Sequence, residues 1–288
     1  MLAEVLTQLV IVIAALLPIS VAIFIDRERL ARTRTDWRRR LRTAAPIIGI
    51  LAVVLVINRV ARQTAPALSR RIGVHLTATF YNVEGEFILL FQSIATAETT
   101  AYFSAIYVYG YTFLLIFPII AYFTLSDTRI FRRLLAAYAL NYAIGLLFYI
   151  FVIAYGPRNL MPAELGETML YDTNPQYKYL TREVNTNTNV FPSLHTSLSA
   201  TVAAFASMTR SEFPKWFPIA VVLAASVAIS TMFLGIHWGI DVTAGLILAA
   251  VCVALSDRLV DRWSLSELLD DRFPQLQEWL TDDDGEQA

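Results

Sequence analysis

The chain of 288 residues is 56% hydrophobic and has a mean hydropathy of +0.53. Soluble domains contain about 45–50% apolar residues, so this composition excludes an ordinary soluble enzyme. The net charge of −1 does not by itself indicate a class of partner, and no nucleic-acid partner is expected. The single cysteine, Cys252, excludes an intrachain disulfide.

Apolar stretches of about 20 residues, the length that a bilayer core requires, recur along the chain. They predict an all-α polytopic transmembrane helix bundle of about six to seven spans. The first stretch lacks a basic lead-in and a small-residue cleavage site, so we expect a retained span rather than a signal peptide. The expected spans are Leu2–Ile25, Ala45–Val60, Tyr102–Leu125, Leu134–Tyr155, Leu194–Met208, Phe217–Ile236 and Ile240–Leu255.

The segment Glu86–Thr99 is apolar but is interrupted by Gln92 and Glu98. It fits an interfacial or a re-entrant segment, so counts of six or eight spans stay open. The spans divide the chain into an N-terminal part (1–130), a membrane core (131–256) and an acidic tail (257–288).

The arginine distribution predicts the orientation of the chain, because loops that stay in the cytoplasm carry an excess of basic residues. The Asp26–Arg42 loop has eight arginines and is expected inside the cell, which places 16 of the 23 basic residues inside. The chain is then a multi-pass protein of the cell membrane, with residues 156–190 and both histidine segments described below on the outer face. Three basic residues of this outer loop, Arg158, Lys178 and Arg182, are candidates for holding an anion.

The pair His237 and Asp241 carries the clearest chemistry. A spacing of four residues places both side chains on one helix face. The carboxylate can then accept the Nδ1 proton, which leaves Nε2 as a nucleophile and stabilises the cation formed when a phosphoryl group is taken up. A hydrogen bond that only fixes a helix start is the alternative.

The segment Phe191–His195 (FPSLH) is the second candidate. Pro192 can open a helix and Ser193 then lies in its first turn, where unpaired backbone N–H groups and the hydroxyl can bind an anion. His195 can act there as the general acid for a departing oxygen. An ordinary helix cap with an incidental histidine is the alternative.

These two segments resemble the motifs of the type 2 phosphatidic acid phosphatase superfamily, which read KxxxxxxRP, PSGH and SRxxxGxHxxxD. Residues 192–195 (PSLH) are similar to the second motif, and residues 230–241 share the spacing of the third. The resemblance covers about Tyr138 to Leu255. It implies that His237 is the nucleophile, Asp241 its orienting partner, His195 the acid and Ser193 a phosphate contact.

The chain departs from this pattern at its positive residues. Thr231 stands where the third motif has arginine, so Thr231 is the candidate for the phosphate contact at that position. The first motif is not intact: Arg158 follows Pro157 in reversed order, without the upstream lysine, and is the best candidate for the missing anion clamp, with Lys178 and Arg182 as replacements. A neutral residue at 231, together with FPSLH, is more similar to the inositol phosphorylceramide synthase branch.

The resemblance implies an integral membrane lipid-phosphate phosphotransferase or phosphatase that works through phosphohistidine. Its substrate is a membrane lipid phosphate, the acceptor is a polyol or a lipid hydroxyl, and neither a metal nor another cofactor is needed. A phosphatidate or polyprenyl diphosphate phosphatase is the alternative, and a non-catalytic lipid-binding or transport protein is a third. The tyrosines between 102 and 122 are expected to be interfacial and packing residues. Glu84 either helps to bind a hydroxylated acceptor or solvates an interfacial helix, and we expect the latter.

Overall fold

The computed structural model describes residues 2–161, 165 and 190–262. Helices dominate it, and six of those described are long and apolar enough to cross a membrane. The fold is the expected all-α polytopic bundle. The elements in chain order are α1 (Leu2–Phe24), α2 (Arg27–Ile72), β1 (Val74–His75), α3 (Thr77–Glu84), α4 (Leu89–Gln92), α5 (Ala97–Ala105), η1 (Ile106–Gly110), α6 (Tyr111–Phe123), α7 (Arg129–Phe151), β2 (Val152–Ile153), α8 (Pro157–Leu160), α11 (Leu194–Met208), α12 (Trp216–Phe233) and α13 (Gly239–Arg262).

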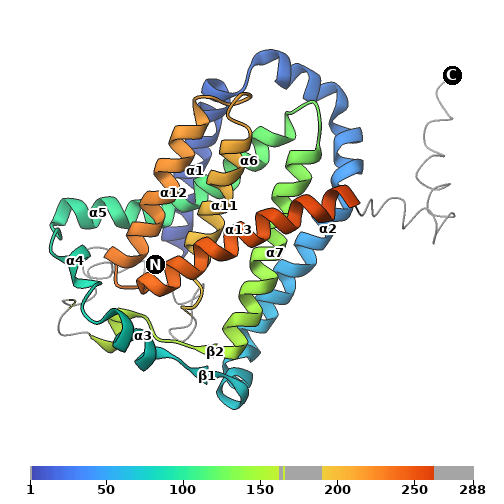
Figure 1. The fold of residues 1–288 in the computed structure, drawn as a ribbon. Helices are drawn as coiled ribbons and strands as arrows, with labels where there is room; N and C mark the ends of the chain where they lie inside the picture. Colours follow the sequence, from blue (N-terminus) through green and yellow to red (C-terminus); the bar gives the residue numbers. More distant parts are fainter. Residues whose placement is uncertain (1, 162–164, 166–189, 263–288) are drawn as a thin grey trace, which may run out of the picture.

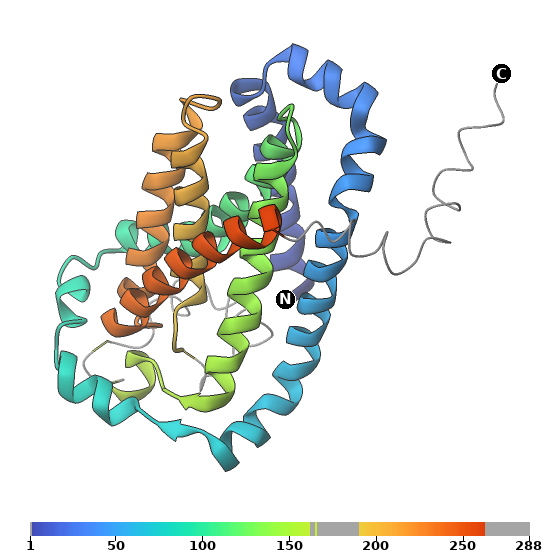
Figure 2. The same ribbon diagram turned by 45° about the vertical axis from the view of Figure 1, so that its right-hand side comes forward.

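Helix α2 corrects the expectation of an arginine-rich loop. Residues 26–42 are not a loop: α2 begins at Arg27 and continues for 46 residues through Pro46. Arginine, leucine and alanine are strong helix formers, and charge does not distinguish a loop from a solvated helix. Figures 1 and 2 show this basic half of α2 curving over one end of the bundle before α2 descends beside α7.

The apolar segment between α3 and α5 does not form a further span among the described residues. Short turns and the four-residue α4 fill it, and the chain then enters a continuous helix of 27 residues, Ala97–Phe123. This helix contains a π-helical turn, η1, at Ile106–Gly110. Turns of this kind are frequent at functional sites because they shift the register of the side chains.

Helix α11 lies in the middle of the bundle and packs on α7, α12 and α13. Its 15 residues span about 22 Å, which is short for a bilayer core of about 30 Å. A buried polar network joins it to α7: the Asn141 amide donates to Thr201 Oγ1 at 3.2 Å, and the Ser197 hydroxyl donates to Asn141 Oδ1. Such bonds hold helices together in lipid, where apolar contacts alone give little specificity.

The two ends of the bundle differ in what they carry. One end holds the basic half of α2 and the links α6–α7 and α11–α12. The other end holds the two-residue parallel β1–β2 pair, α3, α4, α8 and the starts of α11 and α13 (Figures 1 and 2). Both histidine segments therefore lie at the end opposite to the arginine-rich first part of α2, residues 27–42.

Candidate active site

The link between α12 and α13 carries His237 in a fixed turn. Gly235 has a φ of +63°, in the left-handed region that glycine adopts without strain. The backbone N–H groups of Ile236 and His237 then both donate to the carbonyl of Thr231, at 2.9 and 3.1 Å. The turn thus presents the histidine two residues before α13 begins.

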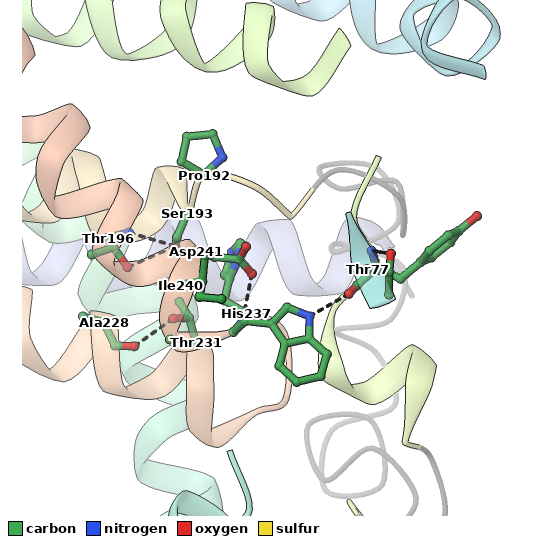
Figure 3. A network of polar contacts seen from close by, with 12 residues as sticks. Thr77, Pro192, Ser193, Thr196, Ala228, Thr231, His237, Ile240 and Asp241 are labelled. Atoms are coloured by element: carbon green, nitrogen blue, oxygen red, sulfur yellow. Dashed lines mark hydrogen bonds and ion pairs between the residues drawn. The ribbon is translucent and has the colours of Figure 1, made fainter. Parts of the chain in front are cut away.

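His237 and Asp241 pair as the spacing predicts, but not along one helix face. His237 precedes α13, whereas Asp241 lies in its first turn, and Nδ1 and Oδ2 are 3.4 Å apart (Figure 3). The same Oδ2 accepts the backbone N–H of Trp238 at 2.8 Å. His237 is only 2% exposed, and Asp241 is fully buried. At 3.4 Å the two atoms are close, but Nδ1 makes no hydrogen bond of standard geometry to a described residue.

The surroundings of His237 keep its ring neutral. Burial lowers its pKa to about 3, the nearby positive charge of Arg158 acts in the same direction, and a hydrogen bond with the backbone of Val190 opposes them. A neutral imidazole is the form that can attack phosphorus, so these surroundings suit a nucleophile at neutral pH.

Ser193 is the N-cap of α11. Its Oγ accepts the Thr196 backbone N–H at 3.3 Å and the Thr196 hydroxyl at 3.0 Å (Figure 3). Its own N–H donates to the carbonyl of Asp241 at 3.0 Å, which joins the two motifs directly. Gly245 permits this approach, because a Cβ there would lie 2.6 Å from the Ser193 carbonyl oxygen.

His195 follows on the first turn of α11 and lies near His237. The centroids of the His195 and His237 rings are 6.3 Å apart. Two tyrosines of the α5–α6 helix contact His195: Tyr107 is stacked at 4.6 Å, and Tyr111 is tilted at 4.5 Å. From the sequence we expected these tyrosines to be packing and interfacial residues. Their spacing of four residues, which places them on one helix face, is the sequence feature that could have indicated a shared contact with His195.

Arg158 is the one candidate of the basic loop that the structure describes. Its backbone N–H donates to the carbonyl of Gly235 at 2.9 Å, so α8 is held against the turn that carries His237. The half-buried Arg158 is close enough for its charge to lower the pKa of His237. Lys178 and Arg182 lie outside the described residues.

Thr231 is buried in the last turn of α12, and its hydroxyl donates to the carbonyl of Ala228 at 2.7 Å (Figure 3). Its carbonyl holds the His237 turn. Thr231 is thus placed beside the site, with its hydroxyl engaged by its own helix, and its contact with phosphate stays a prediction.

Glu84 contacts the site through a helix cap that the sequence did not predict. Its carboxylate accepts the backbone N–H groups of Gly239, at 2.8 Å, and of Ile240. It therefore caps the start of α13, from a position about 155 residues away in sequence. A negative charge at a helix N-terminus stabilises the helix, so Glu84 fixes the turn that carries Asp241.

Within the described ranges, no three histidine, cysteine or acidic side chains gather in a group that could hold a metal ion. The site consists of two histidines, a carboxylate, a helix start and an arginine. This set can take up a phosphoryl group on nitrogen, protonate a leaving oxygen and stabilise an anion.

Comparison with known proteins agrees with this chemistry. No curated protein matches the chain, and neither does any solved structure. A sequence model of the PAP2 superfamily matches residues 80–255, beginning earlier than the motifs alone indicate and including Glu84, Tyr107 and Tyr111. Membership of this family supports lipid phosphatase or phosphotransferase activity on lipid phosphates in a bilayer. Since the match covers well over half of the chain, this protein belongs to the PAP2 superfamily.

Proposed function

We propose that this protein is a membrane lipid phosphotransferase of the inositol phosphorylceramide synthase type, with a phosphohistidine intermediate on His237. The observation that carries the proposal is the pairing of His237 with Asp241, with His195 6.3 Å away between ring centroids. The donor is a lipid phosphate ester, and the acceptor is a polyol or a lipid hydroxyl.

The reaction has two steps. His237 Nε2 attacks phosphorus and forms a P–N bond, the P–O bond to the leaving group breaks, and His195 gives its proton to the departing oxygen. Asp241 stabilises the cationic ring. In the second step His195 removes the proton of the acceptor hydroxyl, whose oxygen attacks phosphorus and breaks the P–N bond, and both histidines return to their first state.

The start of α11 and the charge of Arg158 stabilise the phosphoryl oxygens. Helix starts favour anions, and Ser193 places that start beside Asp241. Lys178 and Arg182 are further candidates for the same task. The basic half of α2 lies at the opposite end of the bundle, which supports an active site on the outer face of the cell membrane.

The neutral Thr231 favours transfer over hydrolysis, because it stands where the phosphatase motif has arginine. A phosphatase acting on phosphatidate or polyprenyl diphosphates is the second candidate, favoured by the complete His237–Asp241–His195 set. A non-catalytic lipid-binding or transport protein is a third, favoured by the altered first motif.

A panel of lipid phosphates, offered with and without inositol-type polyols and read by mass spectrometry, tests the proposal. We expect headgroup-exchanged lipid only when an acceptor is present, no product from His237→Ala, and unchanged product from the exposed control His75→Ala. Release of phosphate without an acceptor would favour the phosphatase. No turnover together with no vanadate binding would favour the non-catalytic protein.

A further inference from the structure

A second cavity lies at the opposite end of the bundle from His237. It has a volume of about 490 Å³ and is lined by α2, α7 and the end of α13. This size falls within the range of small-molecule sites, about 300–1,000 Å³. No part of the proposed reaction uses it.

The lining of this cavity is amphipathic along its length. At one end it is lined by Arg42 of α2 and by Arg132, in the first turn of α7. From there it continues to Val54 and Ala143 through mostly apolar side chains. The two helices run side by side in the same direction (Figure 1), so both arginines lie at one end. At 1.5 Å per residue, the apolar wall extends about 16–18 Å from them.

The two arginines have no acidic partner among the described residues. The neighbouring cations are neutralised: Arg133 pairs with Asp257 at 3.0 Å, and Asp36 lies 3.8 and 3.9 Å from Arg39 and Arg40. No ion pair is found for Arg42 or Arg132 in the described part of the chain. Arg132 Nε is shielded from solvent and has no hydrogen-bond partner there. A shielded N–H group without an acceptor is costly, so an anion beside the half-buried Arg132 would be favoured.

We propose that this cavity binds one anionic phospholipid, with the phosphate on Arg42 and Arg132 and an acyl chain along α2 and α7. The occupant follows from the two ends of the cavity: an amphiphile satisfies both two cations that have no acidic partner among the described residues and an apolar wall. Arg42 belongs to the arginine-rich stretch that is expected at the cytoplasmic surface, where anionic lipids gather. Basic pockets between transmembrane helices on that side are typical headgroup sites.

The site is independent of the proposed catalysis but shares a helix with it. Leu259 and Val260 line the cavity near one end of α13, and Asp241 stands at the other. The 18 residues from Asp241 to Leu259 span about 27 Å. A lipid bound here therefore contacts the helix that holds the catalytic carboxylate without contacting the reacting atoms.

Native mass spectrometry of the full-length, delipidated protein tests the inference, with phosphatidylglycerol and zwitterionic phosphatidylcholine as the probes. We expect one phosphatidylglycerol to be retained about tenfold more tightly than phosphatidylcholine, as for one charge-assisted contact. Arg42→Gln/Arg132→Gln should lose this preference, and Ala143→Phe, which fills the apolar wall, should lower retention of both lipids. Thermal unfolding of each variant checks that it is folded.

Two controls keep the test specific. Arg34→Gln/Arg38→Gln removes the same charge from exposed positions of α2 and should retain phosphatidylglycerol as the wild type does. Arg158→Ala weakens lipid binding only at the catalytic end, where the proposed function places a lipid phosphate, and should still retain one phosphatidylglycerol. Unchanged retention in Arg42→Gln/Arg132→Gln, equal loss in the exposed double variant, or loss in Arg158→Ala would each overturn the proposal. The proposal would also be overturned if the wild type were a lipid-free dimer that dissociates in Arg42→Gln/Arg132→Gln. A second copy of the chain would then be the occupant of the cavity.

Discussion

The carboxylate of Asp241 lies 3.4 Å from Nδ1 of His237 and at the same time accepts the backbone N–H of Trp238. One oxygen therefore orients the ring and fixes the turn that carries it. The two tasks can be separated, because an amide oxygen can keep the bond to Trp238 but cannot supply the negative charge.

Asp241→Asn should lower kcat by about 10²–10⁴-fold with little change in KM, since the charge acts on the cationic ring formed during transfer. The turn should persist, so thermal unfolding should move little. Steady-state kinetics with the lipid substrate found in the panel measure this. Asp257→Asn, at the other end of the same helix, is the matched control, and an equal loss there would argue against a catalytic carboxylate.

Arg158→Ala should weaken vanadate binding by about 10–100-fold, the range expected when one charged hydrogen-bond donor is removed. Arg158→Lys should lose less, because it keeps the charge and gives up only the planar fork. Isothermal calorimetry or displacement kinetics can measure the affinity. Arg71→Ala removes an exposed arginine from the same end of the bundle, and its affinity should equal that of the wild type.

The stability of the protein should depend on pH through His237. In the unfolded chain an ordinary histidine binds a proton below a pKa of 6.5, whereas in the folded protein the pKa of His237 is about 3. Between these values the unfolded state holds the extra proton, so acidification lowers the free energy of unfolding by up to about 1.4 kcal/mol per pH unit. Above pH 6.5 the ring is neutral in both states, so His237 no longer makes the stability depend on pH.

His237→Gln should flatten the decline between pH 6.5 and 3, whereas His75→Gln, at an exposed histidine, should leave it unchanged. Denaturant titrations in detergent at several pH values give the two slopes. Parallel curves for the wild type and His237→Gln would mean that the ring is protonated in the folded protein.

The sequence was most informative where the chemistry is local. Ser193, His195, His237 and Asp241 lie at or near the starts of two helices, and their spacing indicated that His237 and Asp241 would meet. The contributions of Glu84 and of the two tyrosines were missed, because they come from distant segments and neither residue type has a motif there. The helix at residues 27–42 was missed because a run of arginines fits a loop and a solvated helix equally well.

Glu84→Gln should destabilise the start of α13. The carboxylate accepts two backbone N–H groups, and an amide retains one acceptor oxygen without the charge, so we expect a loss of about 1 kcal/mol in the free energy of unfolding. Hydrogen exchange of the amides of Gly239 and Ile240 should quicken. Glu86→Gln, at an exposed position two residues away, should alter neither measurement.

Gly245 decides how closely α13 approaches α11, and Gly49 offers a matched control in a membrane helix. A Cβ on Gly245 would lie 2.6 Å from the Ser193 carbonyl oxygen and 3.2 Å from Thr196 Cβ, whereas a Cβ on Gly49 would meet no atom within 4 Å. Gly245→Ala should therefore push α13 away from the cap of α11 and cost about 1–3 kcal/mol of stability, the range for overpacking. Gly49→Ala should be neutral, or stabilising by up to about 1 kcal/mol.

The activity of the two alanine variants should differ more than their stability. The bond from Ser193 N–H to the Asp241 carbonyl crosses the same contact, so displacement of α13 moves the carboxylate relative to both histidines. A misplacement of about 1 Å can cost about 100-fold in rate. Folded Gly245→Ala protein with wild-type kcat would show that the catalytic geometry does not depend on this helix contact, because the only change in that protein is the methyl group between the two motifs.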